Sequence, residues 1–535
     1  MKKKLMVCLL IAIMAATMGL TACGGGGSSS GGGGGEATPA GGGDTLKVVD
    51  AEWYGIDVYQ LDSSSNFQSL CSESLFEWDN DTMDIADGVL TNWEVSEDGK
   101  TATFTVPKGR IYPVTGEEML AEDVVASIEH GKKVSPYADG YANIESMDYD
   151  NETGQVTLHL TSFRSDMLYN MSSDFMCIID KDELDTMSDE ELMWGCHPYG
   201  MYYLDNYVSG SEVTLKRNDA FVTDSPLVEN KGAAHFETVI CQFNVEDFTA
   251  LESLKNGDVQ MLCSIGADTV AELEGNDSVV IEDTSYPDID FIEINTTNKT
   301  FKDNYNLRLA FCLLVDREAL CELTDGSAVP AYSMIFDTMQ NFNQEAKDYF
   351  IENFANDKEK AHQLIEGEGY TKNAEGYYEK DGKVLELDFY CSSSSLPTVI
   401  AEGLQGMMQE EGIKINLSSI DWNYVHEQAA SDDYDIVREG LSWAEPILIL
   451  NTCYYDKNAP GATQEYYDFV SEIAQTVDSD ERTEKVGEIQ KKMYENLDII
   501  PLYSEKGFMA HSTALTGYKI QSDGTYSFND VRWAE

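Results

Sequence analysis

From Leu46 to the C-terminus the chain alternates β-strand patterns with amphipathic helix patterns and has few prolines, which restricts it to a mixed α/β fold. Residues 101–106 alternate polar and apolar side chains, as a half-buried strand does. Residues 121–130 carry apolar side chains at helical spacing, and two acidic residues in the first turn complement the helix dipole. Since a domain holds roughly 100–200 residues, a chain of 535 residues is predicted to form two to four domains.

Two further helices are predicted in the second half of the chain, at residues 357–365 and 398–411, because both segments are amphipathic. Gly412 follows the second segment and is predicted to be its C-cap, ahead of a strand at residues 413–417. No internal repeat is visible in the sequence. We therefore expect separate α/β lobes.

The N-terminal segment is typical of an export signal. Three lysines at positions 2–4 precede an apolar stretch at residues 5–20, which is short for a membrane-spanning helix. The stretch ends in Leu-Thr-Ala-Cys, which resembles the lipobox of bacterial lipoproteins, where the cysteine thiol receives a lipid. We therefore predict a lipoprotein signal peptide at residues 1–22 and lipidation of Cys23. An ordinary secretory signal and an uncleaved anchor are the alternatives.

The segment after Cys23 is predicted to be a flexible tether. Glycine occupies twelve of the twenty positions at residues 24–43, and such a composition cannot bury apolar surface. We predict that residues 23–45 comprise the lipidated cysteine and a Gly/Ser linker, on the order of 25 Å long. This places the folded body outside the cell, anchored to the membrane through lipid alone.

The charge of the chain excludes one class of partner. The sequence has 35 Lys and Arg residues against 96 Asp and Glu residues, a formal net charge of -61. A surface this acidic repels phosphates and anionic lipid headgroups, because binding to them requires basic side chains. Apolar residues make up 42 % of the chain, which is enough for large cores. We therefore exclude nucleic acid, and membrane contact through a basic patch.

Cysteine spacing argues against metal and redox chemistry. Of the eleven cysteines, nine remain beyond Cys8 and Cys23, and none forms a CxxC pair. Cys177, Cys263 and Cys312 lie inside apolar runs, which is typical of small buried hydrophobic residues. We predict that most of the nine are free thiols.

From residue 46 to the C-terminus, several short motifs follow one another in a recognisable order. The longest is GVLTNWEVSEDGKTATFTVPKG at residues 88–109, followed by AEDVVASI at residues 121–128. The shorter ones are Pro198-Tyr199, VTLKRN at 213–218, LRLA at 307–310, VDR at 315–317, Lys360-Ala361, Gly369-Tyr370, DER at 480–482 and IPLY at 500–503. Together they resemble the bacterial extracellular solute-binding proteins of family 5, the oligopeptide-, dipeptide- and nickel-binding lipoproteins of ABC importers.

Two segments depart from the pattern of that family. Residues 195–199 read GCHPY where the family has GTGPY, and residues 112–117 read YPVTGE where it has F-x-D-G-x-P. These departures leave the implied fold unchanged and weaken inferences about which ligand is held.

The resemblance implies an α/β fold of the type II periplasmic-binding-protein kind, with two lobes, an extra domain and a ligand cleft between the lobes. Lobe I is implied to start at residues 46–65, continue through 191–285 and end with 499–535. The extra α/β subdomain then spans residues 66–190, and lobe II spans residues 286–498. A ligand drives closure of the lobes only if it contacts both lobes. A ligand that binds the open and closed states equally well does not shift the equilibrium between them.

In peptide-binding members of the family the ligand backbone is held as an added strand. The matching segment here is REGLSWAEP at residues 438–446. The resemblance implies that Gly440, Leu441 and Ser442 form the edge that pairs with the ligand, and that Trp443 forms a pocket wall.

Four other positions are weaker candidates for ligand contact. Glu445 is the nearest acid to the place of the family's amine-anchoring aspartate, and the alternative is a solvated loop carboxylate. Arg438 either pairs with a ligand carboxylate or belongs to a structural ion pair. Tyr199 matches a position near the cleft, with core packing as the alternative, and Ser64 matches loosely another ligand-facing segment.

An exported enzyme is the competing class. Residues 426–430 read HEQAA, which begins like a zinc-protease motif but lacks its second histidine. Residues 440–444 read GLSWA, which lacks the final glycine of a nucleophile elbow. The seven histidines have no metal-ligand spacing. We therefore predict no catalytic residue, no metal site and no cofactor.

We predict a lipid-anchored monomer that captures short peptides outside the membrane and delivers them to the permease and ATPase subunits of an ABC importer. The alternative within the same class is a binding protein for another solute, such as a nickel chelate, a sugar or an amine. The alternative from a different class is an extracellular hydrolase or adhesin with the same fold.

Overall fold

The computed structural model describes residues 43–534 apart from 62–64, 66, 80–83, 298, 432, 455–458 and 521–525. The predicted signal peptide, the lipidation site Cys23, nearly all of the linker and the candidate Ser64 lie outside the described residues. No helix in the described part of the chain is long and apolar enough to cross a membrane.

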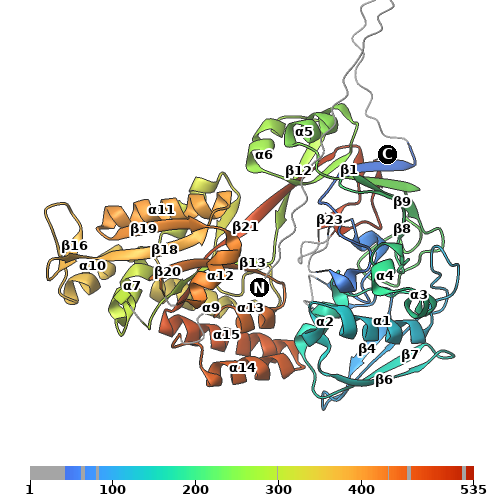
Figure 1. The fold of residues 1–535 in the computed structure, drawn as a ribbon, viewed down its shortest axis with the longest axis horizontal. Helices are drawn as coiled ribbons and strands as arrows, with labels where there is room; N and C mark the ends of the chain where they lie inside the picture. The colour runs from blue at the N-terminus through green and yellow to red at the C-terminus, as the bar shows by residue number, and fades with distance from the viewer. Residues whose placement is uncertain are drawn as a thin grey trace, which may run out of the picture. The chain divides into compact units, whose positions relative to one another are not determined.

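A twelve-stranded sheet joins distant parts of the described sequence (Figure 1). Ten of its strands lie side by side in the order β19 (Lys414–Ile420), β18 (Glu386–Ser392), β20 (Ile436–Ser442), β13 (Asp288–Ile294), β21 (Ile499–Ser512), β11 (Met261–Ile265), β1 (Thr45–Val49), β10 (Thr238–Gln242), β9 (Glu212–Arg217) and β8 (Tyr202–Val208). Two more strands, β12 (Val279–Ser285) and β14 (Ala328–Pro330), also pair with β21.

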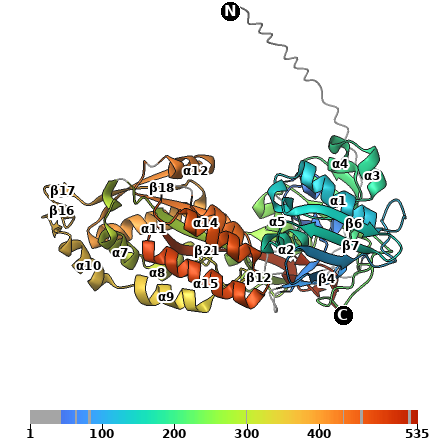
Figure 2. The ribbon, with the colours of Figure 1, turned by 90° about the horizontal axis from the view of Figure 1, so that it is seen from below.

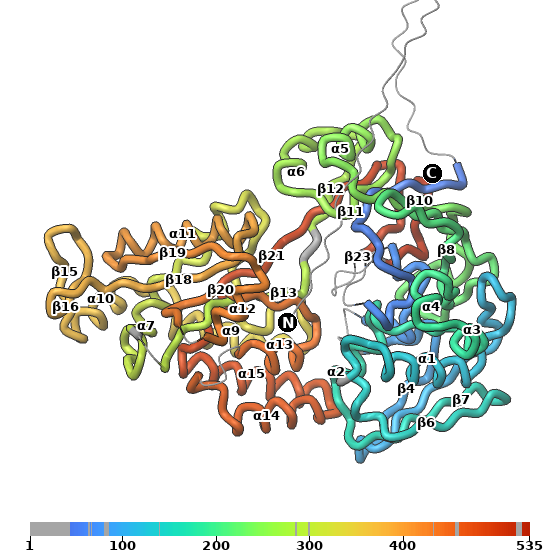
Figure 3. Tube along the Cα trace, viewed as in Figure 1, coloured from blue at the N-terminus to red at the C-terminus, as the bar shows by residue number. Residues whose placement is uncertain are grey.

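The long strand β21 belongs to both halves of this sheet. Its first residues pair with β13, where Ile500 lies opposite Ile292, and its last residues pair with β11, where His511 lies opposite Met261. Figure 3 follows the trace of β21 from β13 towards β11 and β12. One continuous strand therefore connects the two halves.

A separate four-stranded antiparallel sheet lies near the N-terminus of the described chain. Its order is β4 (Thr91–Val95), β5 (Thr101–Thr105), β7 (Gln155–Leu160) and β6 (Ile144–Asp150). Helix α1 (Ala121–Val134) packs against β6 and β7 (Figure 2). The strand predicted at residues 101–106 and the helix predicted at residues 121–130 are confirmed.

The remaining elements surround these sheets. In the first half they are β2 (Glu77–Asp79), β3 (Asp84–Ala86), α2 (Ser165–Ser172), α3 (Lys181–Thr186), α4 (Asp189–Gly195), α5 (Asp247–Asn256) and α6 (Ala267–Leu273). In the second half they are α7 (Tyr305–Leu314), α8 (Arg317–Cys321), α9 (Gln344–Phe354), α10 (Lys358–Gly367), β15 (Thr371–Lys372), β16 (Tyr378–Lys380), β17 (Lys383–Val384), α11 (Ser395–Glu411), α12 (Trp422–Ala430), α13 (Pro446–Thr452), α14 (Gln464–Gln475) and α15 (Ser479–Asn496). The C-terminal strands are β22 (Leu515–Thr516), β23 (Lys519–Ile520), β24 (Tyr526–Ser527) and β25 (Arg532–Trp533).

The two helices predicted in the second half are confirmed as α10 and α11. Helix α10 begins after Asp357 because that residue is its N-cap and its carboxylate accepts from the Lys360 N–H at 2.9 Å. Gly412 caps α11 with a φ of 93°, a left-handed conformation that glycine adopts at little cost. The strand predicted at residues 413–417 is present as β19.

The buried apolar side chains form two large clusters, one for each half of the main sheet. The first cluster contains side chains from β1, α1, β9 and β10, and Met509 of β21 also packs there. The second contains side chains from β13, β18, α7, α11 and α15, together with Ile499, Ile500 and Leu502 from the start of β21. Each half therefore has its own core, as the predicted lobes require.

All nine cysteines in the described part of the chain are buried thiols that form no disulfide, as the sequence predicted for most of them. Burial raises the pKa of the Cys312 thiol to about 11 and that of Cys321 to about 12. Because the thiolate is the reactive form, these side chains act as small apolar groups in the cores.

Candidate functional site

Strand β20 has a free backbone edge near its end. All seven of its residues pair with β13, from Ile436 opposite Ile294 to Ser442 opposite Asp288. On its other side, β18 pairs only with Ile436 and Val437. Among the described strands, none pairs with that second side from Arg438 to Ser442. The predicted Gly440–Ser442 edge is therefore open to an added strand.

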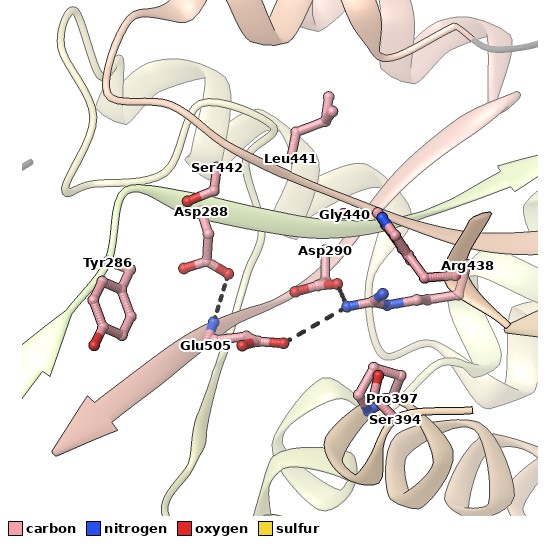
Figure 4. Close-up of a pocket in the computed structure, with 11 residues that line it drawn as sticks. Tyr286, Asp288, Asp290, Ser394, Pro397, Arg438, Gly440, Leu441, Ser442 and Glu505 are labelled. Carbon is pink, nitrogen blue, oxygen red and sulfur yellow. Dashed lines mark hydrogen bonds and ion pairs between the residues drawn. The ribbon is translucent and has the colours of Figure 1, made fainter. Parts of the chain in front are cut away.

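A cavity of about 260 Å³ lies beside this edge, and we call it the strand-edge cavity (Figure 4). Its walls come from β13, β20, β21 and the first turns of α11 and α12. They consist of Tyr286, Asp288, Asp290, Ser394, Pro397, Trp422, Arg438, Gly440, Leu441, Ser442 and Glu505. Four of the predicted site residues, Arg438, Gly440, Leu441 and Ser442, therefore line one cavity.

Arg438 forms the structural ion pair that the sequence left as an alternative, and it also lines the cavity. Its guanidinium pairs with Asp290 and donates to the Tyr503 hydroxyl at 2.9 Å. It lies 3.8 Å from the Glu505 carboxylate. Its Nε is buried and has no hydrogen-bond partner among the described residues. The guanidinium is therefore held mainly by groups of the protein itself.

The strand-edge cavity contains more carboxyl groups than cations. Asp288, Asp290 and Glu505 face one guanidinium, that of Arg438. Burial raises the pKa of Asp288 to about 7, although the Ser504 hydroxyl and the Glu505 N–H both donate to its carboxylate at 2.8 Å. A cationic group placed beside Asp288 would lower that pKa and favour the ionised form. The cavity is therefore suited to a positively charged group.

Trp443 lines a second cavity of about 290 Å³ and does not line the strand-edge cavity, so its role as a wall of the ligand pocket stays a prediction. Because four of its lining residues are aromatic, we call it the aromatic cavity. Its walls consist of Pro136, Tyr137, Gly140, Arg164, Asp166, Tyr169, Asn170, Phe175, Trp443, Leu448 and Asn451. They come from the segment after α1, from α2 and the residues around it, and from α13 and the segment leading into it.

Glu445 is buried, so the alternative interpretation of a solvated loop carboxylate is wrong. It is the N-cap residue of α13, and its exposed fraction is 0 %. The hydroxyl of Ser165, at the start of α2, donates to its Oε1 at 2.6 Å. Glu445 does not line either of these two cavities. Its role as an amine anchor stays a prediction.

Burial gives Glu445 a pH-dependent effect on stability, because it raises the pKa of this carboxyl from 4.5 to about 7. The folded chain then holds a proton that the unfolded chain releases above pH 4.5, so stability falls as the pH rises from 4.5 to 7. Glu445→Gln keeps an acceptor for Ser165 and removes that cost, on the order of 3 kcal/mol at pH 8. We expect this variant to raise the Tm at pH 8 and to change it little at pH 5.

Differential scanning fluorimetry at the two pH values measures this effect. Glu427→Gln, which replaces an exposed carboxyl on α12, is the matched control and should leave the Tm difference between the two pH values as it is in the parent chain. An equal loss of Tm for Glu445→Gln at both pH values would contradict the prediction.

Tyr199 packs in the core, which was the alternative that the sequence left open. Its exposed fraction is 0 %. Its hydroxyl donates to the Val222 carbonyl at 2.8 Å, and its ring stacks on Phe221 with centroids 5.5 Å apart. The structure therefore places Tyr199 away from the walls of both cavities.

The carboxyl groups of the strand-edge cavity were not predicted from the sequence. Asp288 and Asp290 alternate with apolar residues in β13, a strand that is buried along its whole length. Acidic residues are rarely buried unless they are paired, so this alternation is a signal that could have identified them. Glu505 carries no such local signal. Among the described residues, no group of His, Cys, Asp and Glu side chains could hold a metal ion.

Comparisons with known proteins bear on the family and the fold. The dipeptide-binding protein of Escherichia coli (strain K12) is 21 % identical over 494 residues, which cover 85 % of this chain and 88 % of that protein. The structure of NikA from Brucella suis in complex with Fe(III)-EDTA matches with a TM-score of 0.76 and 16 % identity, over 92 % of this chain and 100 % of that one. AppA from Bacillus subtilis, solved with a nonapeptide, matches with a TM-score of 0.65 and 20 % identity, over 93 % and 100 %.

These solved structures confirm the predicted two-lobe α/β fold. The model of the family described as bacterial extracellular solute-binding proteins, family 5 Middle, matches residues 84–460, which is more than half of the chain. The chain therefore belongs to family 5 of the bacterial extracellular solute-binding proteins, and it is a solute-binding protein rather than an enzyme.

Proposed function

We propose that the chain captures short peptides outside the membrane and delivers them to the permease of an ABC importer. The observation that carries this proposal is the free edge of β20 at Gly440–Ser442 beside the strand-edge cavity. An extended peptide can pair with such an edge through its main chain, so the affinity depends little on the identity of its side chains. The dipeptide-binding relative and the nonapeptide complex of AppA support the same choice of solute.

The charges of the strand-edge cavity support an amine-bearing solute. A peptide carries an ammonium group at its N-terminus, and the cavity carries three carboxyl groups against one guanidinium. The ammonium group of a peptide therefore has partners of the opposite charge in this cavity.

The sequence motifs near the N-terminus support a location outside the cell. The export signal and lipobox support a mature chain that starts at Cys23 and is held at the outer face of the cell membrane by lipid. The glycine-rich linker lets the folded body reach both solute and permease. We expect a monomer that works with the permease and ATPase subunits and needs no cofactor.

Native mass spectrometry of the protein purified from its own host tests the proposal. Bound peptides appear as a ladder of masses that differ by amino-acid residues and disappear on denaturation. One defined small molecule, such as a metal chelate or a sugar, would contradict the choice of peptides and support another solute. Hydrolysis of an added peptide by the purified protein would contradict the binding function itself.

A further inference from the structure

We propose that the aromatic cavity holds an aromatic ring of the bound solute, so that the protein selects peptides that contain phenylalanine, tyrosine or tryptophan. This inference rests on the proposed peptide-binding function and adds a side-chain preference to it. It assigns specificity to residues of α2 and its neighbouring segments, none of which the sequence motifs identified.

Two of the rings that line the aromatic cavity already pack against each other. Tyr137 and Phe175 meet edge to face, with centroids 5.1 Å apart and an angle of 64° between the rings. Tyr169 and Trp443 line the same space. Edge-to-face and offset packing of rings at such distances is favourable beyond the burial of apolar area. A further ring can therefore join an existing aromatic cluster.

The cavity leaves part of this aromatic surface open. Tyr137 is 38 % exposed and Trp443 is partly exposed, although both line a concave space. The volume of about 290 Å³ lies at the lower end of the range for small-molecule pockets, roughly 300–1,000 Å³. A space of this size suits one ring of a solute rather than a whole peptide.

The charged residues of the aromatic cavity neutralise each other. The Nε of Arg164 lies 2.9 Å from Oδ1 of Asp166, and the two side chains form an ion pair. The strand-edge cavity, in contrast, has an excess of carboxyl groups. Positively charged groups of a solute are therefore favoured in the strand-edge cavity and an uncharged ring in the aromatic cavity.

The two cavities are lined by residues that follow one another in the chain, and the walls of the aromatic cavity come from both halves of the protein. Ser442 lines the strand-edge cavity, and the next residue, Trp443, lines the aromatic cavity. Side chains of an extended peptide project alternately from its two faces, so a peptide paired with Gly440–Ser442 can direct one of them towards Trp443. A ring held there also touches Tyr137 and Phe175 in the first half, so it favours the closed arrangement over the open one.

Isothermal titration calorimetry with matched tripeptides tests the inference. The probes are Ala-Ala-Ala, the three peptides with one alanine replaced by phenylalanine, and the same three with cyclohexylalanine, which keeps the size and loses the π-system. We expect at least one phenylalanine peptide to bind at least tenfold more tightly than Ala-Ala-Ala and more tightly than its cyclohexylalanine counterpart. Equal affinity for all the peptides would overturn this inference and leave the proposed function standing. Binding of none of them would overturn both.

Variants that remove single rings test whether the preference for phenylalanine peptides arises in the aromatic cavity. Phe175→Leu and Tyr137→Leu each remove one ring and keep apolar volume, and we expect each to reduce the ratio of phenylalanine-peptide to Ala-Ala-Ala affinity at least threefold. Tyr149→Leu, an exposed tyrosine on β6 that does not line the cavity, is the matched control and should keep the ratio.

A 19F NMR spectrum of a bound, fluorinated peptide reports the surroundings of its ring in the parent chain directly. A peptide with para-fluorophenylalanine should show a bound resonance shifted by the ring currents of Tyr137, Phe175 and Trp443, and Trp443→Leu should reduce that shift. A preference that survives all three ring-removing variants, or a bound 19F resonance at the free position, would overturn the assignment to this cavity.

Discussion

Gly440→Ala is expected to weaken solute binding by roughly 10- to 100-fold. A Cβ atom at this position would lie 2.7 Å from Oδ1 of Asp290 and 3.3 Å from Nη2 of Arg438. Both side chains are buried and ion-paired, so neither can move away easily. Gly440 lines the strand-edge cavity, which is the proposed place of the solute (Figure 4). A solute that packs against the added methyl group meets an overpacking cost of about 1–3 kcal/mol in the bound state, and about 1.4 kcal/mol corresponds to a tenfold change in affinity.

Calorimetric titration with a peptide that the parent chain binds measures this loss. Gly406→Ala, in the helix α11, is the matched control because a Cβ there meets no atom within 4 Å. We expect it to leave the affinity unchanged and to stabilise the helix slightly. Full affinity in Gly440→Ala would remove the edge of β20 from the binding site.

Arg438→Met is expected to lower the free energy of unfolding by about 3–5 kcal/mol, because it leaves Asp290 buried without its counter-ion. Asp290 is 2 % exposed, and its ion pair with Arg438 lies inside the protein. The same change removes the hydrogen bond to the Tyr503 hydroxyl. Methionine fills a similar volume, so the effect comes from the unpaired charge and the lost hydrogen bond rather than from a cavity.

Urea denaturation followed by circular dichroism measures the change. The double variant Asp290→Asn with Arg438→Met removes both charges, and we expect it to recover at least half of the lost stability. A double variant as unstable as Arg438→Met alone would show that the charge of Asp290 is not the cause. Thr324→Val, at a buried position outside the strand-edge cavity where the hydroxyl donates to the Cys321 carbonyl at 2.7 Å, controls for the general cost of losing a side-chain hydrogen bond.

Local elements of the fold could be predicted because their causes lie within a few residues. The alternation at residues 101–106 requires only that one face of a strand be buried, and β5 shows it. Helix α11 ends at Gly412 because glycine adopts a positive φ at little cost, and no contact from elsewhere is needed for that. The order of the motifs identified the family before any side chain was placed.

The candidate binding site could be predicted only in part. The motif match pointed to Gly440, Leu441, Ser442 and Trp443, which are consecutive in the chain and lie together in any fold that keeps β20 extended. It could not separate the two interpretations of Tyr199 or Glu445. The Tyr199 hydroxyl donates to the Val222 carbonyl, and Glu445 accepts from the Ser165 hydroxyl. Both side chains are buried because segments distant in the sequence pack over them.

The sequence by itself determined the mixed α/β class, the family and the segment that carries the free strand edge. Only the tertiary structure decided which charges face that edge. Asp290 reaches the cavity because β13 pairs with β20 so that Asp290 lies opposite Gly440, and it lies opposite Tyr503 of β21 as well. Such a register is set by the burial of whole strands against two cores, and it brings together residues that no local pattern connects.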